Sequence, residues 1–254
     1  MPQTVDILGV KVCAEELENL INYVIKSTRR TNKRIVIACA NPHSVRIAKE
    51  LNEFMSALNS FDVVLPDGVG VLFAAKFLGY DIKKRISGPD FFEVLTTRLN
   101  QIGGFSYFFV GSTDEVLNRI VERMSKDFPN IRVSGTYAPP YTEGLYLPEA
   151  ESLKIIDLVN TANPDFLWVG MTAPKQELWI YKYIDKLVNV KVIGAIGAAF
   201  NFFSGTKKRS PKIFRDLGLE WLLRFINEPK RLWKRTFVSA PVFLYYVLME
   251  KLRR

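Results

Sequence analysis

The chain has 254 residues, of which 48% are hydrophobic and 24% are charged, and this composition excludes a disordered protein. Two cysteines and a single histidine exclude a His/Cys metal cluster and a disulfide framework, so a reducing cytoplasm is the expected compartment. The net charge of +9 is regional, because residues 207–254 hold 13 basic and 4 acidic residues while residues 1–206 hold 22 of each sign.

Two kinds of membrane segment are absent from the sequence pattern. The first residues form only a short apolar run, interrupted by Asp6 and Lys11, which is unlike a secretory signal. A bilayer-crossing helix needs about twenty apolar residues, and the longest late run, residues 236–249, is shorter and contains Pro241. The pattern predicts a protein that does not span a membrane.

Short apolar runs alternate with helical patterns through most of the chain. A first helix is predicted around Leu17 to Ile25, and a second begins after Asn41 as its N-cap. We expect strands over residues 5–12, 34–38, 62–65, 105–110, 131–135, 165–169 and 190–195. The later helices are expected over residues 42–52, 69–78, 89–101, 114–126, 148–160 and 174–187.

This alternation predicts an α/β fold: a Rossmann-like, mainly parallel sheet with helices on both faces, formed by residues 1–205. Residues 206–254 are predicted to be a C-terminal basic helical appendage. Sites in such sheets form beyond the carboxyl ends of the strands. The unusual short motifs all follow predicted strands, so they are expected along one edge of the sheet; they are residues 39–41, 66–68, 111–112, 170–176 and 197–201.

Asp67 directly follows an apolar strand and precedes Gly68 and Gly70, which allow a close approach of backbone to a ligand. A carboxylate in this place is suited to take a proton from an acceptor hydroxyl as a general base. The alternative is that Pro66-Asp67-Gly68 is an ordinary turn whose aspartate caps the next helix.

The segment 172–177 opens a helix after another apolar strand. Lys175, Gln176 and the free amides of the first helical turn could bind a phosphate or sugar hydroxyls. The alternative is a plain helix start, with Pro174 at its first position and Glu177 interacting with the helix dipole.

Residues 194–201 are rich in small side chains, but they do not form a dinucleotide-binding fingerprint, and no Walker A motif occurs in the chain. Close packing of helix on sheet would explain these residues, and donor binding by Asn201 is the alternative. Arg85 lies in a basic loop and could neutralise a leaving diphosphate, although solvated surface charge is the commoner role. Because the chain has no Asp-x-Asp pair, positive side chains rather than a metal are expected to stabilise that charge.

Several stretches, taken in order, resemble the WecG/TagA/CpsF family of glycosyltransferases: "PDGVG", "KRISGPDF", "FFVGS", "VGMTAPKQELWI" and residues 194–235. The resemblance runs from about Val5 to Arg235. It implies an inverting, metal-independent and cofactor-independent transfer from a UDP-sugar to undecaprenyl-diphosphate-linked N-acetylglucosamine. The implied donor is UDP-N-acetylmannosamine or its uronic acid, and the implied place is the inner face of the bacterial cell membrane, in teichoic acid, common antigen or exopolysaccharide synthesis.

The resemblance assigns the catalytic base to Asp67 and further catalytic roles to Arg85 and Gln176. Two positions depart from the family pattern, since Cys39 stands where many members have threonine and Asn201 where many have aspartate. Either change could alter the donor sugar. The expected donor-binding residues are Cys39, Asn41, Gly68, Gly111, Pro174, Lys175, Glu177, Gly197 and Asn201.

The basic appendage is also rich in aromatic residues, and this combination suits an anionic membrane surface. Nucleic acid is disfavoured as a partner, because apolar runs such as residues 241–249 would be costly there. Packing of the appendage on the core or on a second subunit is the remaining option, and a homo-oligomer is possible. By resemblance, Arg224, Arg231 and Arg235 grip the diphosphate.

Two alternative functions remain at this point. The same fold could use a different UDP-sugar, such as one carrying glucose or N-acetylmannosaminuronic acid. The chain could also be a non-catalytic nucleotide-binding scaffold at the membrane.

Overall fold

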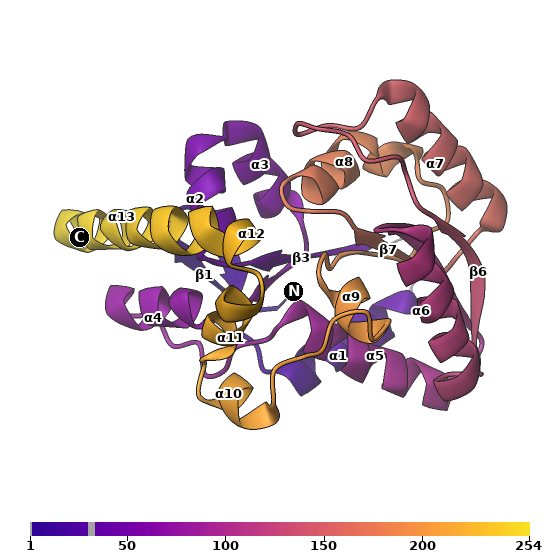
Figure 1. Ribbon diagram of the computed structural model, residues 1–254, viewed down its shortest axis with the longest axis horizontal. Coiled ribbons are helices and arrows are strands. Elements are labelled where there is room, and N and C mark those ends of the chain that lie inside the picture. Colours follow the sequence, from indigo (N-terminus) through magenta and orange to yellow (C-terminus); the bar gives the residue numbers. More distant parts are fainter. Residues whose placement is uncertain (1, 30–33) are drawn as a thin grey trace.

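A computed structural model describes residues 2–29 and 34–254, without the side chains of Asp216, Asn227, Arg231, Lys234 and Arg235. Its centre is a six-stranded parallel sheet with the strand order β4-β3-β8-β7-β5-β6. In Figure 1, β3 and β7 lie in the middle of the molecule and β6 lies toward its right-hand side. The strands are β3 (Ile35–Ala40), β4 (Val63–Pro66), β5 (Phe105–Gly111), β6 (Ile131–Tyr137), β7 (Phe166–Gly170) and β8 (Val192–Ala195). This arrangement confirms the predicted Rossmann-like α/β fold.

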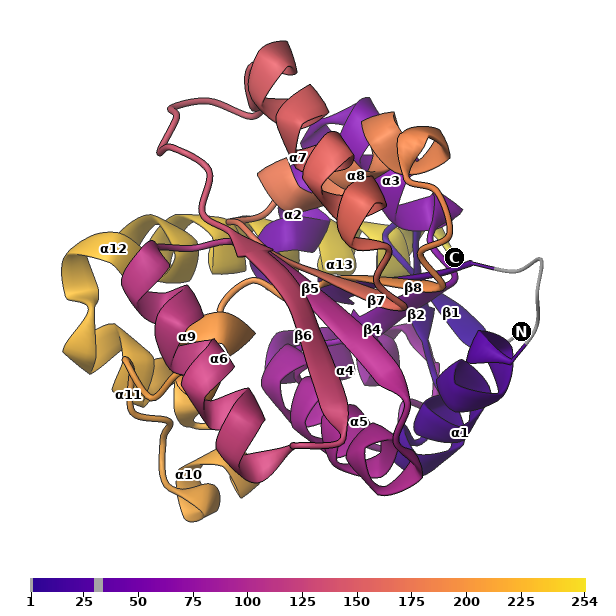
Figure 2. The same ribbon diagram turned by 90° about the vertical axis from the view of Figure 1, so that its right-hand side faces the viewer.

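Helices cover both faces of the sheet (Figure 2). Each face holds its own apolar core. Buried side chains alternate between these cores along a strand: in β7, Leu167 and Val169 face one, whereas Phe166 and Trp168 face the other. The first face is covered by α2 (Pro42–Glu50), α3 (Asn52–Ser60), α7 (Glu149–Ala162) and α8 (Lys175–Tyr183). The second is covered by α1 (Leu17–Thr28), α5 (Gly88–Ile102), α6 (Asp114–Asp127) and α9 (Ala199–Phe203).

The prediction of a single strand over residues 5–12 is wrong. Strands β1 (Thr4–Ile7) and β2 (Val10–Cys13) form an antiparallel hairpin separate from the main sheet. The turn between them needs positive φ at Leu8 and Gly9, and the Asp6 carboxylate accepts a hydrogen bond from the Gly9 amide at 2.7 Å. The Asp6 side chain stabilises this turn, so the first strand ends at Ile7, inside the apolar run that was predicted to be one strand.

Two predicted helices also end earlier than expected. Helix α2 stops at Glu50 because Leu51 is extended, with φ −124°, and α3 then begins at Asn52 as a helix that the periodicity did not predict. Helix α8 ends at Tyr183 and continues only as a short 3₁₀ turn, Ile184–Lys186. The ends of α2 and α8 differ where boundaries are least reliably assigned, whereas α3 is a helix that the sequence pattern missed altogether.

The appendage is helical, as predicted, and its last helix packs on the core. It comprises α10 (Lys212–Asp216), α11 (Glu220–Asn227), α12 (Pro229–Trp233), a π-helical turn (Lys234–Ser239) and α13 (Ala240–Arg253). Helix α13 lies against α2 and α4 (Val69–Leu78), and its Phe243 and Val247 are buried in the first core. The domain boundary at residue 205 stays a prediction. Among the described residues, every helix is too short or too polar to cross a bilayer.

Candidate active site

A cavity of about 690 Å³ opens at the carboxyl ends of the strands. Four of the five predicted edge segments supply several of its lining side chains, and the fifth supplies Ser112. The appendage contributes the opposite wall, through residues of α11, α12 and the start of α13. Of the predicted site residues with described side chains, those that line the cavity are Cys39, Asn41, Asp67, Gly68, Arg85, Gln176, Glu177, Gly197, Asn201 and Arg224.

Asp67 lines this cavity and is half-buried. Its backbone amide donates to the carbonyl oxygens of Ala40, at 2.8 Å, and Leu65, at 2.9 Å, which fixes the residue at the ends of β3 and β4. The N-cap of α4 is Gly68, with φ 103°, so Asp67 does not occupy the capping position that the alternative interpretation gave it. The carboxylate therefore stands where a ligand in the cavity can reach it.

Arg85 lies beside Asp67 in space, because the amide of the next residue, Ile86, donates to the Pro66 carbonyl at 3.1 Å. The Arg85 side chain is only 16% exposed, and its Nη1 lies 2.9 Å from Oε2 of Glu220 in α11. This ion pair joins the core to the appendage inside the cavity wall. The Glu220 carboxylate therefore already occupies part of the Arg85 guanidinium, which the sequence predicts to bind a diphosphate.

Gln176 and Glu177 are both almost fully buried and both line the cavity. The Gln176 amide nitrogen donates to Oε1 of Glu177 at 2.8 Å, while Oε1 of Gln176 and Oε2 of Glu177 have no hydrogen-bond partner among the described side chains. Burial raises the pKa of the Glu177 carboxyl to about 7, against the opposing effect of the Gln176 hydrogen bond. The Gln176 oxygen can accept a hydrogen bond from a ligand, and Oε2 of Glu177 can accept one when the carboxyl is ionised or donate one when it is protonated.

Cys39 and Asn41 lie at the end of β3, between these groups. Burial, together with the nearby charges of Asp67 and Glu177, raises the pKa of the Cys39 thiol well above its usual value, so the thiol stays protonated. The Asn41 side-chain oxygen accepts from the amides of His43 and Ser44 and so caps α2, as the sequence predicted. That oxygen is thus already used within the protein.

Three predicted donor-binding residues are not among the side chains that line the cavity. A Cβ atom at Gly111 would lie 2.7 Å from the backbone of Gly170, so this glycine serves the close contact of β5 with β7. Lys175 donates to the carbonyl and hydroxyl oxygens of Thr142, at 2.6 and 2.9 Å, and holds the 138–148 loop. Pro174 is the N-cap of α8 and precedes its first helical residue.

The remaining predicted residues fall into two groups. Gly197, Asn201 and Arg224 line the cavity, and the Arg224 guanidinium lies 5.4 Å from the centroid of the Phe202 ring. Arg231 and Arg235 belong to the appendage, but their side chains lie outside the described part of the structure.

Sequence reasoning missed several lining residues, and the reasons differ. Glu220 was not expected at the site, because its contact with Arg85 spans 135 residues of chain. His43 was not among the predicted site residues, but it lines the cavity, and its Nδ1 lies 2.8 Å from the Ser239 hydroxyl of the appendage. Ser112, Thr172 and Ala198 were not named individually, but they lie in predicted edge segments that follow strands.

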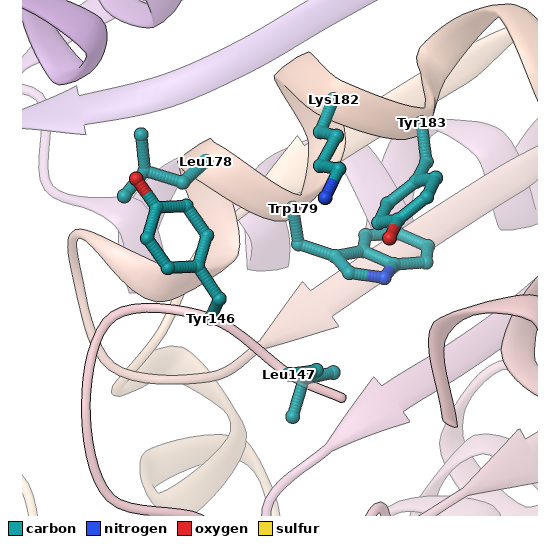
Figure 3. A pocket seen from close by; sticks show the side chains of 6 residues that line it. All are labelled: Tyr146, Leu147, Leu178, Trp179, Lys182 and Tyr183. Carbon is teal, nitrogen blue, oxygen red and sulfur yellow. The ribbon is translucent and has the colours of Figure 1, made fainter. Parts of the chain in front are cut away.

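A second hollow lies away from this cavity, where the 138–148 loop packs on α8. Tyr146 and Leu147 of the loop face Leu178, Trp179 and Tyr183 of the helix (Figure 3). Its volume of about 10 Å³ holds no more than one water molecule. The large cavity is therefore the candidate active site.

The charge of the cavity is mixed. Arg85 and Arg224 are its described arginines, and Asp67, Glu177 and Glu220 are its described carboxylates. Among the residues that the structure describes, no three His, Cys, Asp or Glu side chains gather as they would around a metal ion. The side chains present suit an anionic group beside a proton acceptor.

Comparison with known proteins gives the class of this site. Residues 5–254 match the profile of the Glycosyl transferase WecG/TagA/CpsF family. The chain belongs to this family and is a glycosyltransferase of the hexosyl-transferring class.

Particular relatives are named for one activity. Two proteins called N-acetylglucosaminyldiphosphoundecaprenol N-acetyl-beta-D-mannosaminyltransferase are similar to this chain. The one from Bacillus spizizenii is 31% identical over 98% of this chain and 92% of its own length. The one from Bacillus subtilis is 30% identical over 98% and 93%. A protein of the same name from Staphylococcus aureus is 27% identical over 97% and 93%.

Proposed function

We propose that the chain transfers N-acetylmannosamine from its UDP derivative to undecaprenyl-diphosphate-linked N-acetylglucosamine, with inversion and without a metal. One observation carries this proposal: Asp67 and Arg85 lie on adjacent segments in one cavity, with Arg224 contributed from the appendage wall. The names of the relatives support the acceptor and the transferred sugar.

The chemistry follows from the side chains. The Asp67 carboxylate accepts the proton of the acceptor hydroxyl while that oxygen forms a bond to the anomeric carbon. The bond from this carbon to the diphosphate oxygen breaks, and its electron pair stays on UDP. Arg85 and Arg224 stabilise the negative charge of the departing diphosphate. Attack on the face opposite the leaving group inverts the anomeric centre.

The buried pair Gln176–Glu177 contributes to donor binding in this scheme. Oε1 of Gln176 accepts a hydrogen bond from a hydroxyl or amide group of the donor, and Oε2 of Glu177 accepts or donates one according to the protonation of its carboxyl. Gly197 lies beside this pair, since a Cβ there would be 3.5 Å from the Gln176 amide nitrogen, and its φ of 47° favours glycine.

The membrane-facing part of the proposal concerns the appendage. Trp221, Leu222 and Ile226 of α11 are exposed, in a region of high positive charge. This combination favours peripheral attachment to an anionic membrane surface, where a lipid-linked acceptor lies.

The decisive test is Asp67→Asn, which keeps the shape of the side chain and removes the base. We expect transfer to fall by about 10²- to 10⁴-fold. UDP affinity, measured by calorimetry, should stay close to that of the unchanged protein. Asp81→Asn changes an exposed aspartate and serves as the matched control. Full transfer by Asp67→Asn would remove Asp67 from the mechanism.

A panel of UDP-sugars, assayed with a short-chain lipid-diphosphate-N-acetylglucosamine as acceptor, tests which donor the protein uses. We expect UDP-N-acetylmannosamine to be used at the highest kcat/KM, above UDP-N-acetylmannosaminuronic acid and UDP-glucose. A higher kcat/KM for another donor would correct the sugar and leave the mechanism intact. Binding of UDP without transfer from any donor would instead favour the scaffold.

A further inference from the structure

A stripe of exposed apolar side chains runs along the outer side of α4. Val69, Phe73 and Phe77 follow one another at intervals of four residues and are 38%, 54% and 40% exposed. The two phenylalanine rings stack, with their centroids 5.9 Å apart. At a rise of 1.5 Å per residue, the stripe is about 12 Å long. We call these three residues the α4 stripe.

The α4 stripe begins at the cavity. Val69 lines the cavity, and so does Trp221 of α11, which is 47% exposed. The turn before α11 lies directly on Val69, since a Cβ at Gly218 would be 2.4 Å from Val69 Cγ1. The apolar surface therefore continues from the cavity wall to the outside of the molecule, and it is not an isolated patch.

Positive charge lies at the inner end of this apolar surface. Arg224 is three residues from Trp221 on the same helix and lines the same cavity, as does Arg85. A polyprenyl diphosphate has the matching order of groups, because its anionic diphosphate is joined directly to an apolar chain. With the diphosphate near the arginines, the chain has to leave the cavity, and Val69 and Trp221 offer an apolar exit.

We propose that the α4 stripe binds the first part of the polyprenyl chain of the lipid-linked acceptor. The inference rests on the proposed function and adds a lipid-binding site that belongs to the core and not to the basic appendage. Covering Phe73 and Phe77 with an isoprenoid removes apolar surface from water, which favours acceptors with a long chain.

The test compares two acceptors with one head group, one carrying an undecaprenyl chain and one a short alkyl chain. Both are assayed in detergent micelles, with the double variant Phe73→Ala/Phe77→Ala. We expect KM for the undecaprenyl acceptor to rise about ten-fold. KM for the short acceptor and for the UDP-sugar should not change. The control, Ile102→Ala/Val188→Ala, removes two exposed apolar side chains elsewhere and should alter none of these values.

Other outcomes overturn the inference in distinguishable ways. An unchanged KM for the undecaprenyl acceptor, with weaker binding of the variant to acceptor-free vesicles, would make the α4 stripe a bilayer contact. A dimer in sedimentation that the double variant abolishes would make it an interface with a second copy. If the unchanged protein has the same KM for the short and the long acceptor, the inference fails but the proposed function stands. If it transfers to neither, the proposed function fails with it.

Discussion

The carboxyl group of Glu177 is fully buried, and its protonation changes near neutral pH. Its pKa is raised from 4.5 to about 7 by burial, so the native protein holds a proton there that the unfolded chain releases. Between these two pH values the native state binds more protons than the unfolded state, and the stability contributed by this group falls as pH rises.

This gives a prediction for Glu177→Gln, which keeps the shape and removes the titration. As pH rises from 5 to 8, the free energy of unfolding of the variant should increase relative to that of the unchanged protein. The increase over this range should be at most on the order of 3 kcal/mol. Urea unfolding of both proteins at the two pH values measures the difference. Glu122→Gln, at an exposed position of α6, is the control. Parallel pH curves for Glu177→Gln would show that the carboxyl is ionised at a normal pKa.

At the scale of elements, the appendage and the core meet through a few polar contacts around the cavity. The Arg85–Glu220 ion pair joins α11 to the loop before α5, and Arg209 lies 2.7 Å from Asp90 at the start of α5. Under the proposed function, a diphosphate bound by Arg85 competes with Glu220 for this guanidinium. The position of α11 is therefore expected to depend on the ligand.

Glu220→Gln tests this competition. Loss of the negative charge should free Arg85 for phosphate oxygens, and we expect UDP to bind several-fold more tightly in calorimetry. The free energy of unfolding should fall by about 1–3 kcal/mol, because a buried hydrogen bond to a charged group is weakened. Glu228→Gln breaks a comparable pair, with Lys207 at 2.8 Å, outside the cavity lining. If both variants bind UDP alike, Glu220 does not compete with the ligand.

The asymmetry of charge is a property of the whole molecule. Lys212, Lys230 and Lys251 are exposed on the appendage, where residues 207–254 carry a net charge of +9 while residues 1–206 sum to zero. Each basic residue near an anionic membrane contributes about 1 kcal/mol to binding. Attachment should therefore come mainly from this part of the chain and should weaken with salt.

A triple charge reversal, Lys212→Glu/Lys230→Glu/Lys251→Glu, should weaken binding to anionic vesicles by at least about 100-fold. Vesicle co-sedimentation at low salt measures this. The matched control carries the same change in net charge on exposed lysines outside the appendage: Lys11→Glu/Lys126→Glu/Lys186→Glu. Equal losses in the two variants would mean that net charge alone, and not the appendage, determines membrane binding.

Deleting the appendage would be a less specific experiment, because it also removes part of the packed core. Phe243 and Val247 of α13 are 1% exposed and lie in the same apolar core as α2 and α4. Phe243→Ala alone should lower the free energy of unfolding by about 3–5 kcal/mol. Chemical denaturation checks this value against Leu252→Ala, at a position that is 72% exposed and where almost no loss is expected.

The sequence by itself determined the strands of the main sheet, most helices and the position of Asp67 at the end of a strand, because apolar periodicity and residues such as Asn41 act locally. It also carried the family resemblance, whose motifs are contiguous in the chain. Only the tertiary structure decided that Glu220 pairs with Arg85, that Lys175 holds a loop outside the cavity lining, and that Val69 joins the cavity to Phe73. These contacts join segments that are distant in sequence, or depend on which side of a helix faces its neighbour, and side-chain packing rather than local propensity determines them.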